Sequence, residues 1–270
     1  SSNLEWNAIS IAKLFSGAQR ITGVGQCRQD FLEFGKHMLF ADLRGGQLLR
    51  CEILLARADA GRILAAKLMR YANHPDVLVM ALPRGGVPVG YEVARALNAP
   101  LDIMLVRKLG VPGHDELAMG AIASGGIRIL NRNVIESLQI PPDAIEMVEK
   151  RESLELMRRE TNYRGNRPPA NIEGLTIILV DDGIATGSTM RVAIAALREQ
   201  KVGHIVVATP TAPTTVRWEM EALVDDFVAV ITPEDFYGVG QWYDDFTQTD
   251  DDTVHELLRM GEKTQPAKAI

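Results

Sequence analysis

The sequence predicts an α/β protein with a Rossmann-like, mainly parallel twisted sheet flanked by helices. Between about residues 58 and 232, short apolar runs rich in β-branched residues alternate with segments of helical period. This alternation is typical of repeated βαβ units. The composition agrees with such a fold, because 270 residues with 46% hydrophobic and 24% charged side chains suffice for a sizeable core.

The apolar runs predict strands at residues 77–82, 101–106, 176–180, 205–209 and 227–231. Asp59 is expected to cap a helix before the first of these strands. Apolar residues at four-residue spacing predict a second helix that stops at Asn98, in a left-handed conformation. A third helix follows the strand at 176–180.

The segment between the second and third strands follows a different pattern. Residues 110–116 combine glycine, proline and charge without a period, which predicts an exposed loop. Residues 121–131 predict a hairpin turning at Ser124, Gly125 and Gly126. Pro141 and Pro142 open a charged helix that runs to about residue 160.

The two ends of the chain do not share the alternation of the middle. We therefore divide the chain into an N-terminal extension at residues 1–57, a core at 58–232 and a C-terminal segment at 233–270. Both ends are expected to build a small cap over the core, which we call the hood.

Charge and cysteine content exclude several classes of protein. A net charge of −6 argues against a broad cationic surface for nucleic acid. Cys27 and Cys51 are too few for a disulfide scaffold and lack zinc-ligand spacing, which suits a reducing compartment. No apolar run approaches the roughly 20 residues that span a bilayer. We expect a cytoplasmic protein that binds neither nucleic acid nor membrane.

The strongest local motif is an apolar strand that ends in two carboxylates and enters a helix through a turn of small residues. It reads Ile-Ile-Leu-Val-Asp-Asp-Gly-Ile-Ala-Thr-Gly-Ser-Thr over residues 177–189. The hydroxyls of Thr186, Ser188 and Thr189, together with unpaired N–H groups at the helix start, suit a phosphate. Asp181 and Asp182 can accept hydrogen bonds from vicinal sugar hydroxyls.

A ribose 5-phosphate group satisfies both halves of this motif. The alternatives are an ordinary strand-to-helix turn capped by Ser or Thr, and a generic nucleotide loop. A Walker loop is excluded because no lysine follows Gly187.

At these residues the chain resembles the type I phosphoribosyltransferase family. The resemblance implies that Asp181 and Asp182 contact the ribose hydroxyls of phosphoribosyl pyrophosphate (PRPP). The loop that would hold its 5-phosphate comprises Ala185, Thr186, Gly187, Ser188 and Thr189. The family's fold is the predicted one, and the resemblance covers about residues 58–232.

A second loop supports the resemblance. Pro83, Arg84, Gly85 and Gly86 follow the strand at 77–82 and precede a helix, so they lie at the same sheet edge. In the family this loop binds pyrophosphate through backbone amides and often contains a cis peptide bond. Arg84 could add a charge-assisted contact. Taken alone, this loop would equally suit an ordinary tight turn.

The resemblance also implies a mobile lid at residues 109–118. Arg107 and Lys108, directly before it, are candidates to stabilise the departing pyrophosphate; the alternative for Arg107 is a solvated side chain. His114 and Glu116 are weaker candidates, His114 as a general acid or pyrophosphate contact.

The chemistry implied by the family is displacement of pyrophosphate from the anomeric carbon, usually by a nitrogen of a base, in nucleotide metabolism. Mg²⁺ accompanies PRPP and is held mainly by substrate oxygens and water, with Asp181 and Asp182 as indirect contacts rather than direct ligands. The acidic run at 244–252 is expected to be a solvated face with a helix cap near Asp252. Dimers are common in the family, so a homodimer is the assembly to test.

The acceptor is the open point. The hood carries aromatic side chains, including Tyr237 and Trp242, that could stack on a base or form the core of the hood. Two alternatives to base transfer stand beside it: a non-catalytic regulator that senses PRPP, and an enzyme that uses water or phosphate as acceptor.

Overall fold

The computed structural model describes residues 33–34, 37–44, 47–165 and 167–263 and divides the chain into two compact units, 1–53 and 54–270. The first unit contains an antiparallel sheet in the order β1-β2-β3. Its strands are Glu33–Phe34, His37–Arg44 and Gln47–Ile53. Most of the predicted N-terminal extension, including Cys27, lies outside the described residues.

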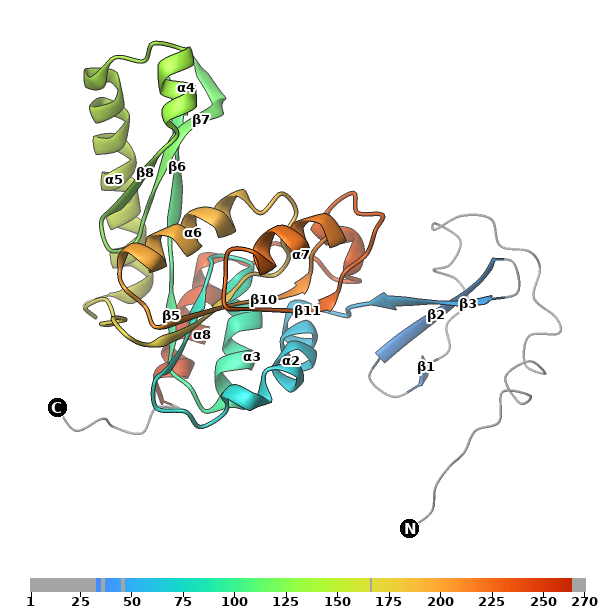
Figure 1. Cartoon of the computed structure of the whole chain (residues 1–270). Helices are drawn as coiled ribbons and strands as arrows, with labels where there is room; N and C mark the ends of the chain where they lie inside the picture. The colour runs from blue at the N-terminus through green and yellow to red at the C-terminus, as the bar shows by residue number, and fades with distance from the viewer. Residues whose placement is uncertain (1–32, 35–36, 45–46, 166, 264–270) are drawn as a thin grey trace. The chain divides into compact units, whose positions relative to one another are not determined.

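The second unit is built on a five-stranded parallel sheet in the order β11-β10-β9-β4-β5 (Figure 1). Its strands are β4 (Val77–Ala81), β5 (Leu101–Ile103), β9 (Thr176–Val180), β10 (His204–Thr211) and β11 (Asp226–Ile231). All five lie where the apolar runs predict them. The α/β fold with a parallel sheet is therefore confirmed.

Helices cover both faces of this sheet (Figure 1). They are α2 (Arg57–Lys67), α3 (Gly86–Leu97), α6 (Ser188–Glu199), α7 (Thr214–Glu221) and α8 (Asp251–Lys263). Alternate residues of β9 face opposite layers: Ile178 packs in the core beneath α2 and α3, and Ile177 in the core beneath α6 and α7. Burial on both faces explains why the strand is continuously apolar.

The two predicted helix ends have different outcomes. Asn98 ends α3 in the left-handed conformation with φ 53°, as predicted. Asp59 does not cap α2, because the helix already begins at Arg57 and Ala56 is the residue before it. Asp59 instead pairs with Arg62 within the first turns. Helix α2 ends at Lys67 and is followed by a 3₁₀ turn, η1 (Met69–Tyr71).

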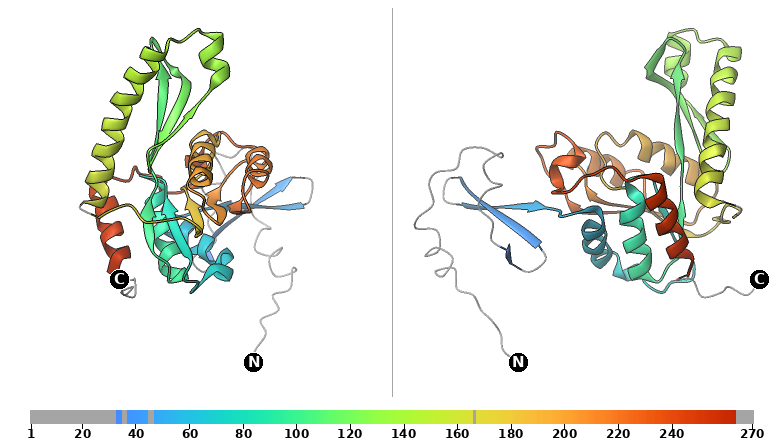
Figure 2. Two further views of the ribbon diagram at one scale, coloured as in Figure 1. Left: turned by 60° about the vertical axis from the view of Figure 1, so that its left-hand side comes forward. Right: turned by 180° about the vertical axis from the view of Figure 1, so that it is seen from behind.

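An arm stands away from the parallel sheet (Figure 2). It contains an antiparallel sheet of β6 (Val106–Val111), β7 (His114–Ala123) and β8 (Ile127–Leu130), followed by α4 (Arg132–Ser137) and α5 (Pro142–Arg164). The predicted hairpin at 121–131 and the charged helix are confirmed.

Two predictions about the arm are wrong. Residues 110–116 are the ends of β6 and β7 around a two-residue turn at 112–113 rather than an open loop, because Leu109 and Met119 are buried and pairing extends to Val111 opposite His114. The strand predicted at 101–106 is also interrupted after Ile103. There the chain leaves the parallel sheet, and the Leu105 N–H donates to the Ser124 hydroxyl at 2.9 Å.

Helix α5 is tied to the parallel sheet by a buried ion pair. The Arg164 Nε lies 2.9 Å from Asp102 Oδ1 on β5, and its Nη2 donates to the Ile103 carbonyl at 2.6 Å. Arg164 is only 6% exposed and Asp102 only 7%. Helix α5 is long but strongly charged, and no described helix is long and apolar enough to cross a membrane.

We expect Arg164→Met to lower the free energy of unfolding by about 3–5 kcal/mol, because it leaves the Asp102 carboxylate buried and unpaired. Arg158→Met on the same helix is the control: its side chain is 68% exposed, and its loss should leave the free energy of unfolding nearly unchanged. Urea denaturation measures both. Equal losses in the two variants would contradict the importance of this pair.

Candidate active site

Two loops meet at the carboxyl edge of the parallel sheet, one after β4 and one after β9. The Leu82 N–H donates to the Val180 carbonyl at 2.9 Å, which joins the loops at their starts. A Cβ atom on Gly85 would lie 2.0 Å from Asp182 Oδ2, and one on Gly86 would lie 2.8 Å from the Val180 carbonyl oxygen. Only glycine allows this approach. The structure thus brings the two predicted loops into direct contact.

The loop after β4 presents both a backbone donor and a cation. The Pro83–Arg84 peptide bond is cis, as the family resemblance led us to expect. The Gly86 and Val87 N–H groups bond within the loop, whereas the Gly85 N–H has no acceptor among the described residues. The Arg84 side chain is partly exposed, with Nη1 3.8 Å from Asp251 Oδ1. An anion beside Gly85 could contact both groups.

The loop after β9 forms a cradle of backbone donors before α6. Gly187 has φ 72°, a left-handed conformation that favours glycine. No acceptor within the described chain binds the N–H groups of Ala185, Thr186 or Gly187. The Thr186 and Ser188 hydroxyls lie 3.1 Å apart at this exposed turn. The helix dipole of α6 adds positive potential, so the arrangement suits a phosphate.

Arg191 is a cation of this loop that sequence reasoning missed. Its Nη1 donates to the Thr186 carbonyl at 2.8 Å, and its other end pairs with Glu219 of α7. The available signal was a basic residue in the first turn of a helix, where the helix dipole disfavours a cation. A cation at such a position indicates that an anionic group or a carbonyl oxygen lies nearby as its partner.

Asp181 and Asp182 are partly buried beside each other at the end of β9. The Asp182 N–H donates to Asp181 Oδ1 at 2.9 Å. Burial, and then the negative charge of Asp182, raise the pKa of Asp181 well above its usual range.

Two further residues belong to the site: Arg57, which sequence reasoning missed, and Tyr243, which it placed among the hood aromatics without a contact to Asp182. Arg57 Nε lies 2.6 Å from Asp182 Oδ2, and the Tyr243 hydroxyl donates to the Asp182 carbonyl at 2.5 Å. Burial raises the pKa of Tyr243, so its hydroxyl stays a donor. Neither residue stands near a recognisable motif, and only the fold brings them to Asp182.

The residues predicted for the lid belong to the arm. The Arg107 guanidinium is held by Glu152 of α5, with its Nε 2.8 Å from Oε2. Lys108 is exposed on β6, and His114 is exposed at the turn between β6 and β7. Glu116 is on β7, but its side chain lies outside the described residues. The structure does not gather these side chains around Asp181.

The C-terminal hood segment packs against the loop after β9. A Cβ on Gly183 would lie 2.2 Å from Val239 Cγ1, in the 3₁₀ turn η2 (Val239–Trp242). Trp242 stacks on Phe236 with ring centroids 6.4 Å apart, while Tyr237 is 91% exposed. The aromatic residues are thus divided between packing within the hood and open solvent.

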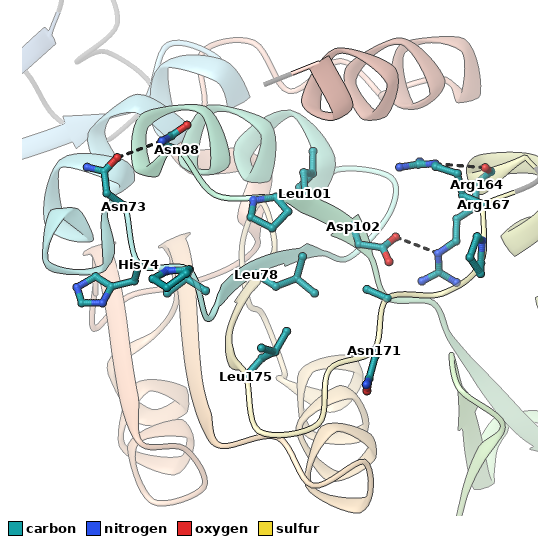
Figure 3. Close-up of a pocket in the computed structure, with 15 residues that line it drawn as sticks. Asn73, His74, Leu78, Asn98, Leu101, Asp102, Arg164, Arg167, Asn171 and Leu175 are labelled. Carbon is teal, nitrogen blue, oxygen red and sulfur yellow. Dashed lines mark hydrogen bonds and ion pairs between the residues drawn. The ribbon is translucent and has the colours of Figure 1, made fainter. Parts of the chain in front are cut away.

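A separate groove of about 420 Å³ lies at the opposite, amino end of the parallel sheet (Figure 3). Asn73 and Asn98 share a hydrogen bond on one side of it, and the Asp102–Arg164 pair lies on the other. Within each pair, the polar groups are already bonded to each other. This groove is not part of the site formed by the two loops.

The described residues contain no cluster of three or more His, Cys, Asp or Glu side chains that could hold a metal ion. Asp181 and Asp182 supply two carboxylates, and Arg57 already pairs with one of them. Such a donor set fits Mg²⁺ that brings phosphate and water ligands with it, and does not fit a protein cage. In the acidic run, Asp250 accepts the Thr253 N–H at 2.7 Å and so caps α8.

Comparison with known proteins gives the family. The model of the phosphoribosyl transferase domain matches residues 51–235, so the chain belongs to this family. A protein of Mycobacterium tuberculosis H37Rv, named "putative phosphoribosyl transferase", is 43% identical over 202 residues. These cover 75% of this chain and 45% of that protein, so the chain spans about half of this relative's length.

Two other relatives match a larger and a smaller share of the chain. The crystal structure of TT1426 from Thermus thermophilus is 36% identical, with a TM-score of 0.67, over 76% of this chain and 97% of that one. The bifunctional protein PyrR of Brevibacillus brevis is 31% identical over 110 residues, which are 39% of this chain and 60% of that protein. The fold predicted from the sequence is thus that of an experimental structure.

We expect Asp181→Asn to be more stable than the wild type at neutral pH. The pKa of Asp181 is raised in the folded state above its unfolded value of about 3.9. The folded protein therefore keeps this proton to higher pH, and wild-type stability falls as pH rises through the raised pKa. Asparagine removes this dependence while keeping the acceptor oxygen for the Asp182 N–H.

Urea denaturation between pH 4 and pH 8 tests this expectation. Asp245→Asn is the control with the opposite sign, because hydrogen bonds from Thr247 lower the pKa of Asp245. Its contribution is lost only as pH falls below its unfolded value of about 3.9, so the Asp245→Asn curve should run nearly parallel to the wild-type curve between pH 4 and pH 8. Parallel curves for the wild type and Asp181→Asn would contradict the raised pKa.

Proposed function

We propose that this member of the phosphoribosyl transferase family binds Mg-PRPP and transfers its 5-phosphoribosyl group to a nitrogenous base, releasing pyrophosphate. The observation that carries the proposal is the direct contact of the Gly85–Gly86 turn with Asp182, next to the phosphate-type cradle before α6. Hydrogen-bond donors for a phosphate, carboxylates that accept hydrogen bonds from a sugar diol, and a second anion site lie along one edge of the sheet. This order matches the 5-phosphate, the ribose and the pyrophosphate of PRPP.

The cradle before α6 supports the place of the 5-phosphate. The free N–H groups of Ala185, Thr186 and Gly187 and the hydroxyls of Thr186, Ser188 and Thr189 offer several donors to one phosphate. These groups need no rearrangement to bind, because α6 already fixes the turn. The interaction anchors the substrate at the end remote from the reacting carbon.

The carboxylates support the place of the ribose. Asp181 and Asp182 follow the cradle's own strand, so a ribose attached to the bound phosphate lies within their reach. Ionised carboxylates accept hydrogen bonds from hydroxyls, and such bonds are stronger than neutral ones. The Gly85 backbone lies against Asp182, and we assign its N–H, which has no acceptor among the described residues, to the pyrophosphate.

The departing pyrophosphate is assigned to Arg84, Gly85 and Gly86. Lys108 joins them from the arm, and Arg107 joins when its contact with Glu152 opens. As the bond between the anomeric carbon and the pyrophosphate oxygen breaks, its electron pair leaves with pyrophosphate. Cations and backbone donors at that oxygen stabilise the developing charge. Mg²⁺, when bound with PRPP, adds charge neutralisation at the same oxygens.

The acceptor nitrogen forms the new bond to the anomeric carbon and loses its proton. Tyr237 and Trp242 of the hood are assigned to the acceptor side, where an aromatic face can stack on a base. His114 and Glu116 are assigned to proton transfer, provided that the arm brings the β6–β7 turn to the sheet edge. The base itself is not specified by these contacts.

Pyrophosphate release from Mg-PRPP tests the function. The acceptors are purines, pyrimidines, pyridine carboxylates, phosphate and water. Release that depends on one base is the expected result. Release with water or phosphate alone would replace base transfer by hydrolysis or phosphorolysis. Tight PRPP binding without release under any condition would identify a sensor and overturn the enzymatic proposal.

We expect the double variant Asp181→Asn and Asp182→Asn to bind PRPP about 10- to 100-fold more weakly while keeping its fold. The change removes the charge from hydrogen bonds at nearly constant volume, and bonds to charged groups contribute about 1.5–3 kcal/mol each. Isothermal titration calorimetry gives the affinity, and circular dichroism checks the fold. Asp143→Asn, at the exposed start of α5, is the control; equal affinities in both variants would contradict the ribose placement.

A further inference from the structure

Arg57 occupies an unfavourable position for an arginine. It is the first residue of α2, where the helix dipole favours anions and disfavours cations. Its side chain is also only 11% exposed, and desolvating a charge is costly. A cation held at such a place needs partners that compensate both costs.

The partners of the guanidinium come from two parts of the chain. Nε lies 2.6 Å from Asp182 Oδ2, and Nη1 donates to the Thr247 carbonyl at 2.7 Å. The Cζ atom lies 4.0 Å from the centroid of the Phe246 ring, within cation–π distance. Arg57 is thus fixed by the hood on one side and by the acidic pair on the other.

The backbone before Arg57 is fixed as firmly as its side chain. The Leu54 N–H donates to the Trp242 carbonyl at 2.8 Å, and the Asp244 N–H donates to the Leu54 carbonyl at 2.8 Å. The Asp245 N–H donates to the Leu55 carbonyl at 2.9 Å. Residues 54–57 and the C-terminal hood segment therefore form one support for the guanidinium.

The Asp182 carboxylate is held from several directions. Arg57 takes Oδ2, the Gly85 backbone lies against the same oxygen, and Tyr243 binds the Asp182 carbonyl. The charged and titratable groups that act on it are Arg57, Asp181 and Tyr243, while Asp245 acts on Arg57. Among the described residues, Arg57 is the cation that pairs with this carboxylate, so Arg57 fixes its orientation.

We infer that Arg57 is a positioning residue that orients the Asp182 carboxylate to accept a sugar hydroxyl, and so makes the site selective for ribose 5-phosphate over free phosphate. The inference rests on the proposed function for the class of ligand. It assigns to Arg57 a role in recognising the sugar and none in holding the phosphate, which the cradle before α6 binds. A purely structural role would weaken both ligands alike.

Isothermal titration calorimetry with ribose 5-phosphate and with inorganic phosphate separates these roles. We expect Arg57→Met to weaken ribose 5-phosphate about tenfold, the effect of losing one well-placed bond to a charged group, and to change phosphate binding less than about twofold. Arg57→Lys should restore part of the selectivity, because it keeps the charge. Arg62→Met, further along α2, removes the same charge away from Asp182 and should leave the selectivity unchanged.

Phe246→Leu keeps the test informative if Arg57→Met fails to fold. It removes the ring under the guanidinium at a partly exposed position, and a two- to fivefold loss of selectivity corresponds to about 0.5–1 kcal/mol for a cation–π contact. Wild-type protein that binds ribose 5-phosphate no better than phosphate would overturn the proposed function. Selective wild-type protein with unchanged selectivity in Phe246→Leu and in folded Arg57→Met would overturn only the role of Arg57.

Discussion

The register between β4 and β9 is the constraint on which the candidate site depends. Ala81 pairs with Val180, so the two neighbouring parallel strands end at the same level. The loop after each strand then has no room to avoid the other, and glycine at 85 and 86 is the only residue type that lets the backbones touch. One consequence is that a backbone donor for an anion and a carboxylate for a hydroxyl lie side by side, although about one hundred residues separate them in the chain.

Charge balance is the second constraint on this edge. Burial, and then the negative charge of the adjacent Asp182, raise the pKa of Asp181, and the Asp182 carboxylate itself needs a cation beside it. Arg57 supplies the compensation from the start of α2, and the hood supplies the surroundings that keep Arg57 there. The sheet edge, α2 and the C-terminal segment therefore act as one unit, even though neither α2 nor the C-terminal segment carries a group assigned to PRPP.

The arm shows how a local pattern and a tertiary pattern can differ. Residues 110–116 contain the glycine, proline and charge of a loop, yet they are the strand ends and turn of a hairpin. Pairing with β7 and burial of Leu109 and Met119 override the local preferences. The same arrangement commits Arg107 to Glu152 and ties α5 to the sheet through Arg164. Movement of the arm relative to the sheet edge is thus the step on which the assignment of Arg107 and Lys108 depends.

The sequence by itself predicted the parallel sheet, the succession of strands and helices along the chain, and the two loops at the carboxyl edge of the sheet. Its information was local: continuous apolar strands, small-residue turns and an acidic pair directly after a strand. The tertiary structure alone decided that Asp59 does not cap α2, that the lid segment is a hairpin, and that Arg57, Arg191 and Tyr243 belong to the site. Most of these depend on a partner distant in the chain or on a packing contact, which no short-range pattern encodes; Arg191 left a local signal, a cation in the first turn of α6. The acidic pair after β9 was visible from the sequence, whereas the residue that orients it was not.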